Sequence, residues 1–217
     1  MFVINCKNYQ EVTGEEITKF LRIAHKIAKK YKVKIAVAPP QHLLGVAAKN
    51  PGMILAQHVD IHCVGSTTGF VIPELLKKSK VAGSLINHSE HRIPGSEIKK
   101  LVIRLRKLKM ISIVCVKDTA EAKKYARLDP DYIAIEPPEL IGSGKAVSRH
   151  RPDLITKAAT AIKAGKGTRL LCGAGITSGE DVAVALRLGS KGVLVASGIV
   201  KSKNWEKTIA EFASSMV

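Results

Sequence analysis

The stretch that decides the fold is ISIVCVKDTAEAKKYARLDPDYIAIEP, residues 111–137. The apolar run at 111–116 predicts a buried strand, and the pattern over 118–129 predicts an amphipathic helix. A second apolar run, YIAI at 132–135, predicts another buried strand. A strand, a helix and a strand in this order are typical of two parallel strands joined by a crossover helix.

The same alternation runs through the whole chain. Eight apolar segments predict strands: FVINCK, KIAVAPP, MILAQHV, GSLINH, ISIVCVK, YIAIEP, RLLCGAG and GVLVAS. Helical patterns lie between them, at 14–31, 42–49, 96–110, 118–129, 152–164, 178–188 and 204–215. Strands that are apolar on both faces and alternate with helices predict an α/β fold, a (β/α)8 barrel with a closed, parallel, eight-stranded sheet. We expect a single domain over residues 1–217.

An open doubly wound sheet uses the same alternation and is the second candidate architecture. Its nucleotide fingerprints are incomplete: GAGITSGED has Ser178 where a third glycine is needed, and ELIGSGKA lacks both the first glycine and the final Ser or Thr of a P-loop. After the third strand, a Gly/Ser/Thr-rich loop precedes a short helix near Pro73, so a long loop is expected there.

Composition narrows the class of protein. With 46% apolar and 24% charged residues, and no apolar run near the roughly 20 residues of a membrane span, we expect a soluble protein with no membrane partner. No secretory signal is visible, which favours the cytoplasm. The net charge of +17 suggests a polyanionic partner or an anionic small-molecule substrate. Aromatic residues make up only 4%, so nonspecific rather than specific nucleic-acid binding is expected.

The four cysteines are far apart in the sequence. Cys6, Cys115 and Cys172 lie inside apolar runs, and Cys63 does not. This pattern favours packing over disulfide or zinc roles.

Polar residues follow three predicted strands at their carboxyl ends, where the active sites of (β/α)8 barrels lie. Asn5 and Lys7 end the first strand, and their spacing of two predicts that both point inward. His88 ends the fourth strand and Glu136 the sixth. A lysine, a histidine and a glutamate at one rim predict a catalytic site.

Small residues follow the last three strands: IGSG, GAG and VASG. Small side chains let backbone N–H groups approach a ligand, and the last two loops of such barrels commonly bind phosphate. The sequence therefore predicts a phosphorylated small-molecule substrate.

These segments resemble the triosephosphate isomerase family, specifically its short archaeal branch. INCKNY is similar to the family's Asn-x-Lys strand, INHSEHR to its His-Ser-Glu segment, and IAIEPPELIGSG to its catalytic glutamate and lid. LCGAGITSGED and GVLVASGIVKSK are similar to its phosphate loops, so the resemblance spans essentially the whole chain. The sequence departs from the residues usual in the family at Cys6, Asn8, His91 and Ser143, and none of these differences removes a catalytic group.

The resemblance implies a TIM barrel that interconverts D-glyceraldehyde 3-phosphate and dihydroxyacetone phosphate, an aldose–ketose isomerase of glycolysis and gluconeogenesis. Glu136 is implied as the base, behind a lid that excludes water. His88 is implied as a neutral electrophile whose pKa is lowered by a helix N-terminus, with Ser89 as the helix cap. Lys7 supplies positive charge, Asn5 orients Lys7 or the substrate, and Glu90 is a partner of Lys7.

The resemblance also implies the phosphate-binding set and the partners. Substrate and phosphate contacts are expected from Asn5, Lys7, Ile141, Gly142, Gly173, Ala174, Gly175, Ala196 and Ser197. No cofactor and no metal are implied, and the chain is expected to form a homodimer or homotetramer.

Three alternatives stay open at this point. One is another phosphate-binding barrel isomerase. A second is a metal-dependent barrel hydrolase, because His58, Asp60 and His62 alternate like ligands on an extended segment. A third is a basic barrel that binds nucleic acid or protein, which leaves Lys7, His88 and Glu136 unexplained.

Overall fold

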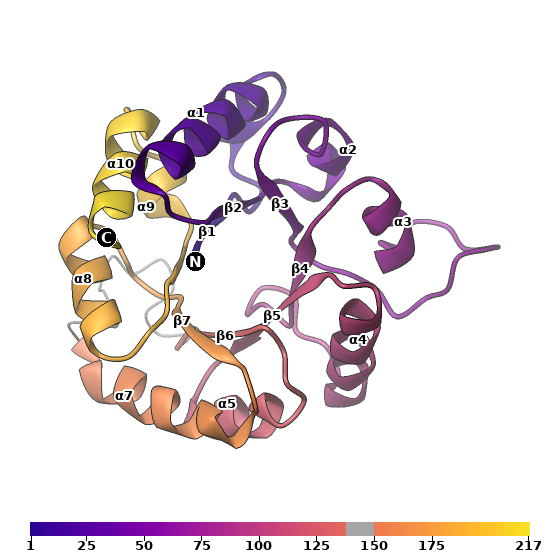
Figure 1. The fold of residues 1–217 in the computed structure, drawn as a ribbon. Coiled ribbons are helices and arrows are strands. Elements are labelled where there is room, and N and C mark those ends of the chain that lie inside the picture. Colours follow the sequence, from indigo (N-terminus) through magenta and orange to yellow (C-terminus); the bar gives the residue numbers. More distant parts are fainter. Residues whose placement is uncertain (138–149) are drawn as a thin grey trace.

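The computed structural model describes residues 1–137 and 150–217, and its eight parallel strands form a closed barrel (Figure 1). Each strand pairs with the next, and β8 pairs with β1 in the register Phe2↔Val193. The strands are β1 Phe2–Asn5, β2 Ile35–Ala38, β3 Met53–Ala56, β4 Gly83–Ile86, β5 Ile111–Val116, β6 Tyr132–Ile135, β7 Arg169–Cys172 and β8 Val193–Val195. The prediction of a closed parallel barrel is confirmed, and the open sheet is wrong.

Helices surround the barrel and match the predicted ranges to within a few residues. They are α1 Glu16–Tyr31, α2 Leu44–Ala47, α3 Pro73–Lys78, α4 Gly95–Lys107, α5 Thr119–Ala126, α7 Pro152–Ala161, α8 Gly179–Arg187, α9 Ser197–Val200 and α10 Trp205–Ser214. The short 3-10 helices are η1 Gln10–Val12, η2 Gln41–Leu43 and η4 Ile162–Ala164. Two of these elements, η1 and α9, were not predicted, because three or four residues carry too little periodicity to be read from sequence.

Two apolar layers hold the fold together. Side chains such as Val3, Leu85 and Leu171 fill the barrel interior, while the other faces of the strands pack against the helices. Phe2 of β1 stacks on Phe212 of α10, with ring centroids 5.8 Å apart and both side chains fully buried. Full burial of one such side chain contributes about 1.5–3 kcal/mol. The strands therefore need apolar residues on both faces, as their sequences have.

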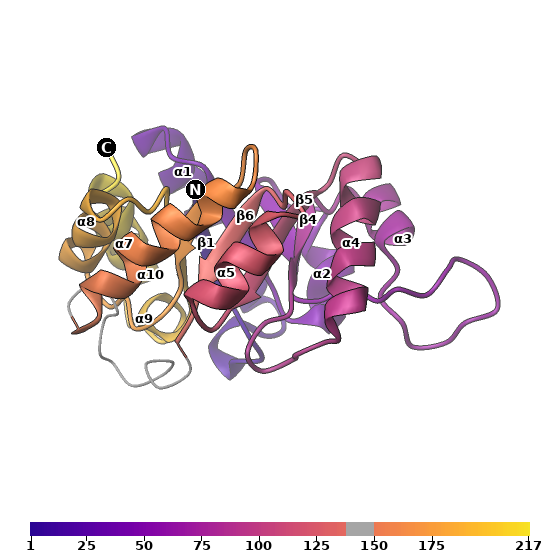
Figure 2. The ribbon, with the colours of Figure 1, turned by 90° about the horizontal axis from the view of Figure 1, so that it is seen from below.

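The strands are parallel, so their carboxyl ends share one face of the barrel and the connections that precede them share the other (Figures 1 and 2). The long loop predicted after β3 projects from the body of the molecule before α3 (Figure 2). Cys6, Cys115 and Cys172 are buried and free, which confirms their packing role, and Cys63 is exposed and free. Among the described residues, no helix is both long and apolar enough to cross a bilayer.

Candidate active site

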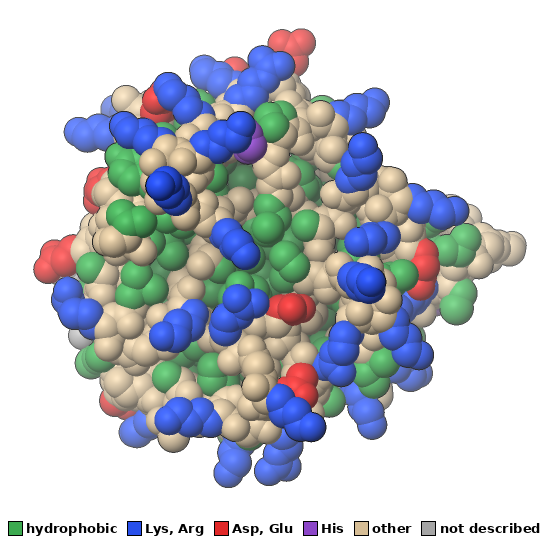
Figure 3. Space-filling view, viewed as in Figure 1, with side chains coloured by type: hydrophobic (Ala, Val, Ile, Leu, Met, Phe, Trp, Pro, Cys, Tyr) green, Lys and Arg blue, Asp and Glu red, His purple; other side chains and the backbone are tan. Residues whose placement is uncertain are grey.

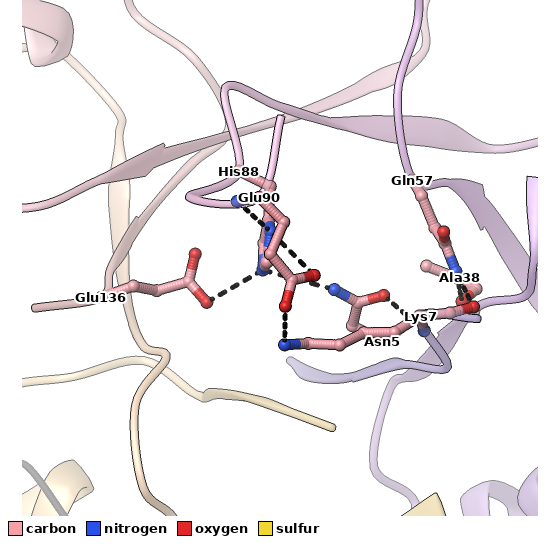
Figure 4. Close-up of polar contacts among 7 residues, drawn as sticks. All are labelled: Asn5, Lys7, Ala38, Gln57, His88, Glu90 and Glu136. Atoms are coloured by element: carbon pink, nitrogen blue, oxygen red, sulfur yellow. Dashed lines mark hydrogen bonds and ion pairs between the residues drawn. The ribbon is translucent and has the colours of Figure 1, made fainter. Parts of the chain in front are cut away.

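Three buried polar side chains meet at the carboxyl ends of β1, β4 and β6. Asn5, His88 and Glu136 are only 3%, 6% and 3% exposed. The Nε2 atom of His88 lies 3.5 Å from Oε1 of Glu136 and 3.5 Å from Nδ2 of Asn5 (Figure 4). Since polar groups are rarely buried without a structural or chemical role, this convergence marks the site.

Glu136 is held by the barrel itself. Its backbone N–H donates to the carbonyl of Val116 at 2.8 Å, which extends the β5–β6 ladder by one residue. The Oε2 atom is buried and has no hydrogen-bond partner within the described part of the chain. A buried carboxylate oxygen that no described donor occupies can take a proton from a ligand at little cost in reorganisation.

His88 lies two residues beyond β4 in a tight turn. Its Nδ1 atom is 3.2 Å from the backbone nitrogen of Glu90. A backbone N–H only donates, so Nδ1 must accept, and the neutral ring then carries its proton on Nε2. This proton faces Glu136 and the space beside Asn5, where it is available to a substrate oxygen.

Two influences on His88 oppose each other. Burial lowers the pKa of the imidazole, while the hydrogen bond to Glu136 and the charges of Glu136 and Glu90 raise it, so the net pKa lies above its ordinary value. Glu136 therefore stabilises a proton on this ring as long as its carboxylate faces Nε2.

Lys7 has a strained backbone that aims its side chain. Its φ of 46° lies in the left-handed region, which costs a residue other than glycine about 1–3 kcal/mol. The backbone N–H of Lys7 donates to Oδ1 of Asn5 at 3.0 Å, and Gln57 Nε2 donates to the Lys7 carbonyl at 2.8 Å. The Nζ atom then reaches Oε1 of Glu90 at 2.5 Å (Figure 4).

These polar side chains line a pocket, and the rest of its lining is mostly small residues and backbone. Asn5, Lys7, His88 and Glu136 line it together with residues that follow β7 and β8, namely Gly173, Gly175, Ile176, Thr177, Ala196, Ser197 and Gly198. The short helix α9 begins at this wall of small residues. The pocket thus brings together a carboxylate, an imidazole and a lysine with loops of the kind that present N–H groups to anions.

The loop after β7 is fixed by a buried aspartate. Asp181 Oδ2 accepts from the backbone N–H groups of Thr177 and Ser178 and from the Thr177 hydroxyl, at 3.0–3.1 Å. Ser178 in turn caps α8 by accepting from the N–H of Asp181. This capping box sets the path of the chain that lines the pocket.

The sequence matches one family over nearly its full length. A family model described as triosephosphate isomerase matches residues 1–212. The chain belongs to the triosephosphate isomerase family.

Named relatives from archaea agree with this assignment. The triosephosphate isomerase of Cenarchaeum symbiosum is 59% identical over 216 residues, which cover 100% of this chain and 97% of the relative. Those of Methanothermus fervidus and Methanocaldococcus jannaschii are each 41% identical, covering 100% and 97% of this chain and 98% and 97% of the relatives.

One expectation taken from the triosephosphate isomerase resemblance is wrong in this chain. Ser89 does not cap a helix: residues 88–91 form a turn closed by the N–H of His91 on the His88 carbonyl. The next helix, α4, begins only at Gly95, after Pro94, and Ser89 Oγ is buried with no hydrogen-bond partner among residues 1–137 and 150–217. No helix N-terminus therefore lowers the pKa of His88, and the Glu90 N–H on Nδ1 instead fixes which tautomer the neutral ring adopts.

Of the other predicted site residues, some line the pocket, one does not, and some are not described. Ile141 and Gly142, and with them Ser143 and Gly144 of the expected lid, lie outside the described residues. Ala174 is 1% exposed and does not line the pocket, whereas Gly173, Gly175, Ala196 and Ser197 do.

Several supporting residues escaped the sequence reasoning. Gln57 lies in a predicted strand, Asp181 in a predicted helix and Gly198 just after the last predicted strand, and none of them was singled out for the site. Asn87, with a φ of 63°, donates to the Cys115 carbonyl and accepts from the Ile93 N–H, which holds the turn that carries His88. A signal existed for Asp181 alone, since Ser followed three residues later by Asp resembles a capping box.

The residues of the metal alternative do not converge. His58 Nε2 lies 3.1 Å from Asp60, and the His58 ring stacks on His91. His62 stacks on Phe70 instead. Within residues 1–137 and 150–217, no group of three potential ligands is gathered at one point, so this arrangement does not favour a metal-dependent hydrolase.

Proposed function

We propose that this chain interconverts D-glyceraldehyde 3-phosphate and dihydroxyacetone phosphate through an enediolate, as an aldose–ketose isomerase of the triosephosphate isomerase family. The observation that carries the proposal is the convergence of Glu136, His88 and Lys7 on one pocket that is also lined by small residues after β7 and β8, which supports a phosphate site there. Moving a proton between two adjacent carbons needs a base, a donor for the oxygens and a counter-charge. The pocket offers one of each.

Glu136 is the proposed base. It takes the proton beside the substrate carbonyl and returns it to the neighbouring carbon. Its burial and the lack of a partner for Oε2 among the described residues support this role, because a carboxylate shielded from solvent competes less with water for the proton. When substrate enters, Oε1 exchanges its contact with His88 for one with the substrate.

His88 and Lys7 are proposed to stabilise the charge that develops on the oxygens. The Nε2 proton of neutral His88 donates to the enediolate, while the Lys7 ammonium balances its charge. Asn5 supports both, since it contacts the ring and accepts from the Lys7 N–H. Glu90 positions Lys7 and His88: its carboxylate pairs with Lys7 Nζ, and its backbone N–H donates to Nδ1 of His88.

The phosphate group is proposed to lie against Gly173, Gly175, Ala196 and Ser197, with Gly198 beside them. Ala174 is proposed to contribute through its backbone, since its side chain is buried. The donors near Ile141 and Gly142 complete the set in this proposal when the lid closes.

The setting of the enzyme is part of the same proposal. We place it in the cytoplasm of an archaeon, in glycolysis and gluconeogenesis, as a single-domain protomer of a homodimer or homotetramer. The archaeal origin of the relatives supports the source. The alternatives of another barrel isomerase or a pure binding module have no comparable support.

The test is a coupled assay on purified protein with D-glyceraldehyde 3-phosphate, in the presence of EDTA. Rapid isomerisation is expected in the wild type, with a loss of at least about 10³-fold in kcat for Glu136→Ala. Glu206→Ala, an exposed acid on α10, is the matched control and is expected to keep full activity. A folded wild type without turnover would overturn the proposal.

A further inference from the structure

The connections that precede the strands carry most of the net charge of the chain. They comprise seven segments: 29–34, 49–52, 77–82, 106–110, 127–131, 163–169 and 187–192. These segments hold 17 of the 35 Lys and Arg residues but only two of the 18 Asp and Glu residues. Their net charge is therefore +15 of the total +17. We call the surface that they form the basic face.

The charges of the basic face are not balanced by ion pairs, although Arg106 donates to the Leu128 and Asp129 carbonyls and Arg169 lies over the Tyr132 ring. All 17 basic side chains are exposed, and in the described part of the chain none lies in an ion pair. The two acids, Asp129 and Asp131, are half-buried and already accept hydrogen bonds from Lys166 N–H and from Ser112. The cations are thus not neutralised within the chain.

The barrel arranges these segments in a ring. Because the sheet closes, each connection lies beside the next around the amino ends of the strands, on the face shown in Figure 3. Backbone hydrogen bonds tie Lys34, Arg169 and Lys191 to the barrel mouth, through Phe2 N to Lys34 O, Arg169 N to Asp131 O and Lys191 N to Leu170 O. The ring therefore rests on a rigid frame.

Three lysines of the basic face occupy left-handed backbone positions that favour glycine. Lys32, Lys80 and Lys109 have φ values of 55°, 64° and 55°, at helix ends where glycine fits without strain. The helix dipole favours cations in the last turn only. It does not account for Lys34, Lys166 and Lys191, which lie beyond the helices.

We propose that the basic face binds the phosphate backbone of duplex nucleic acid without sequence specificity. Of its 17 cations 13 are lysines, which act as point charges on phosphates rather than as bidentate readers of bases. The large exposed apolar residues of the described chain, such as Val46, Phe70 and Leu75, all lie outside the seven segments. The basic face therefore offers a membrane no large exposed apolar anchor. Its one aromatic residue, Tyr31, is half-buried with Lys30 over its ring, so a single strand would find no row of stacking platforms.

The inference does not depend on the proposed function. The basic face is at the amino ends of the strands and the active site at the carboxyl ends, so the two lie at opposite ends of the barrel (Figure 2). Bound duplex is expected to leave isomerase activity unchanged. Strong inhibition by duplex would place the nucleic acid in the active site and overturn the inference.

The first test is fluorescence anisotropy with a labelled DNA duplex of about 20 base pairs and with its RNA counterpart, between about 50 and 200 mM salt. Binding is expected for any sequence, with a slope of log K against log salt of about −4 or steeper. The triple variant Lys34→Gln, Lys166→Gln, Lys191→Gln is expected to reduce the magnitude of that slope by about 2–3 and affinity by about tenfold or more.

A matched control removes the same charge elsewhere: Lys99→Gln, Lys123→Gln, Lys207→Gln, all exposed on other surfaces. It is expected to bind nearly as the wild type does. If both triple variants lost duplex affinity equally, net charge alone would explain binding, and the basic face would not be a binding site. The absence of binding at about 50 mM salt, or tighter binding to phosphatidylglycerol vesicles than to duplex, would also overturn the inference.

A second variant guards against misfolding. Lys32→Gly, Lys80→Gly, Lys109→Gly removes three charges where glycine relieves the left-handed backbone. It is expected to lose affinity as the first variant does while its Tm stays equal or rises. Unchanged affinity in this variant would also contradict the inference.

Discussion

A Cβ atom on Gly173 would lie only 2.5 Å from Cγ of Glu136 and 3.2 Å from its Cδ. The first residue of the loop after β7 is thus in direct contact with the carboxylate proposed as the base. Gly173 is therefore needed for two reasons: it lines the pocket, and it leaves room for Glu136.

The first prediction concerns this contact. Gly173→Ala is expected to displace the Glu136 carboxylate by a fraction of an ångström to an ångström, and to lower kcat by about 10²-fold. Overpacking is expected to cost about 1–3 kcal/mol in the free energy of unfolding. Steady-state kinetics and urea unfolding measure both. Gly167→Ala is the control, since a Cβ there meets nothing within 4 Å; if it lost as much activity, the steric account would fail.

A second prediction concerns the titration of His88. With Glu136 facing Nε2, the imidazole is expected to titrate above its ordinary pKa of 6.5. In Glu136→Gln the opposing effect of burial is the largest that remains, so the pKa is expected to fall below 6.5. NMR of ¹⁵N-labelled histidines against pH measures both values. An unchanged His88 titration in the variant would show that Glu136 does not act on the ring.

The same shift makes stability depend on pH. Because the pKa of His88 is higher in the folded than in the unfolded chain, its protonation stabilises the fold fully at pH values below 6.5. This contribution is lost as the pH rises through the folded-state pKa. The stability difference between wild type and His88→Gln is therefore expected to shrink from acid to neutral pH. A constant difference would argue against the linkage.

A third prediction concerns Gln57, which holds the strained Lys7 through its carbonyl. Gln57→Leu removes the hydrogen bonds to Lys7 O and Ala38 O, at 2.8 and 3.2 Å, so the Lys7 backbone can relax and withdraw its ammonium. We expect kcat/KM to fall about 10- to 100-fold, with a loss of about 1–3 kcal/mol in stability. Gln41→Leu removes one hydrogen bond, to His58 O, without touching Lys7, and is expected to cost stability only. If both variants lost activity alike, Gln57 would have no positioning role.

A fourth prediction concerns Asp181 and the phosphate wall. Asp181→Ala frees the N–H groups of Thr177 and Ser178 and loosens the chain beside Gly175. KM is expected to rise more than kcat falls, because the wall binds the phosphate in ground and transition states alike. Asn204→Ala removes the cap of α10, away from the pocket, and is expected to cost about 1 kcal/mol with unchanged KM. A fall in kcat alone in Asp181→Ala would contradict the assignment of this wall to phosphate.

Much of the architecture could be predicted because its causes are local. Apolar runs such as 111–116 and 132–135 must be buried on both faces, and the helical stripes between them need a sheet to cover. Leu101 and Leu105 on α4 are buried as their spacing requires. The rim position of His88 and Glu136 follows from the same rule, since the carboxyl ends of parallel strands meet at one face.

Other features depend on contacts between distant segments. Strand alternation predicts that Asn5 and Lys7 point the same way, yet β1 ends at Asn5 and the left-handed φ of Lys7 aims its side chain. Gln57, 50 residues away, holds that conformation. The prediction that Ser89 caps a helix was wrong for a related reason. In place of a helix start, the chain forms a turn in which the His91 N–H donates to the His88 carbonyl.

The sequence alone thus determined the order of elements, the closed barrel, the family and the rim residues that carry chemistry, because periodicity and motif spacing are properties of the chain itself. Only the tertiary structure decided the His88 tautomer, the direction of its pKa, the packing of Gly173 on Glu136 and the gathering of charge at one end of the barrel. These depend on distances across the barrel, and closure of the sheet sets those distances.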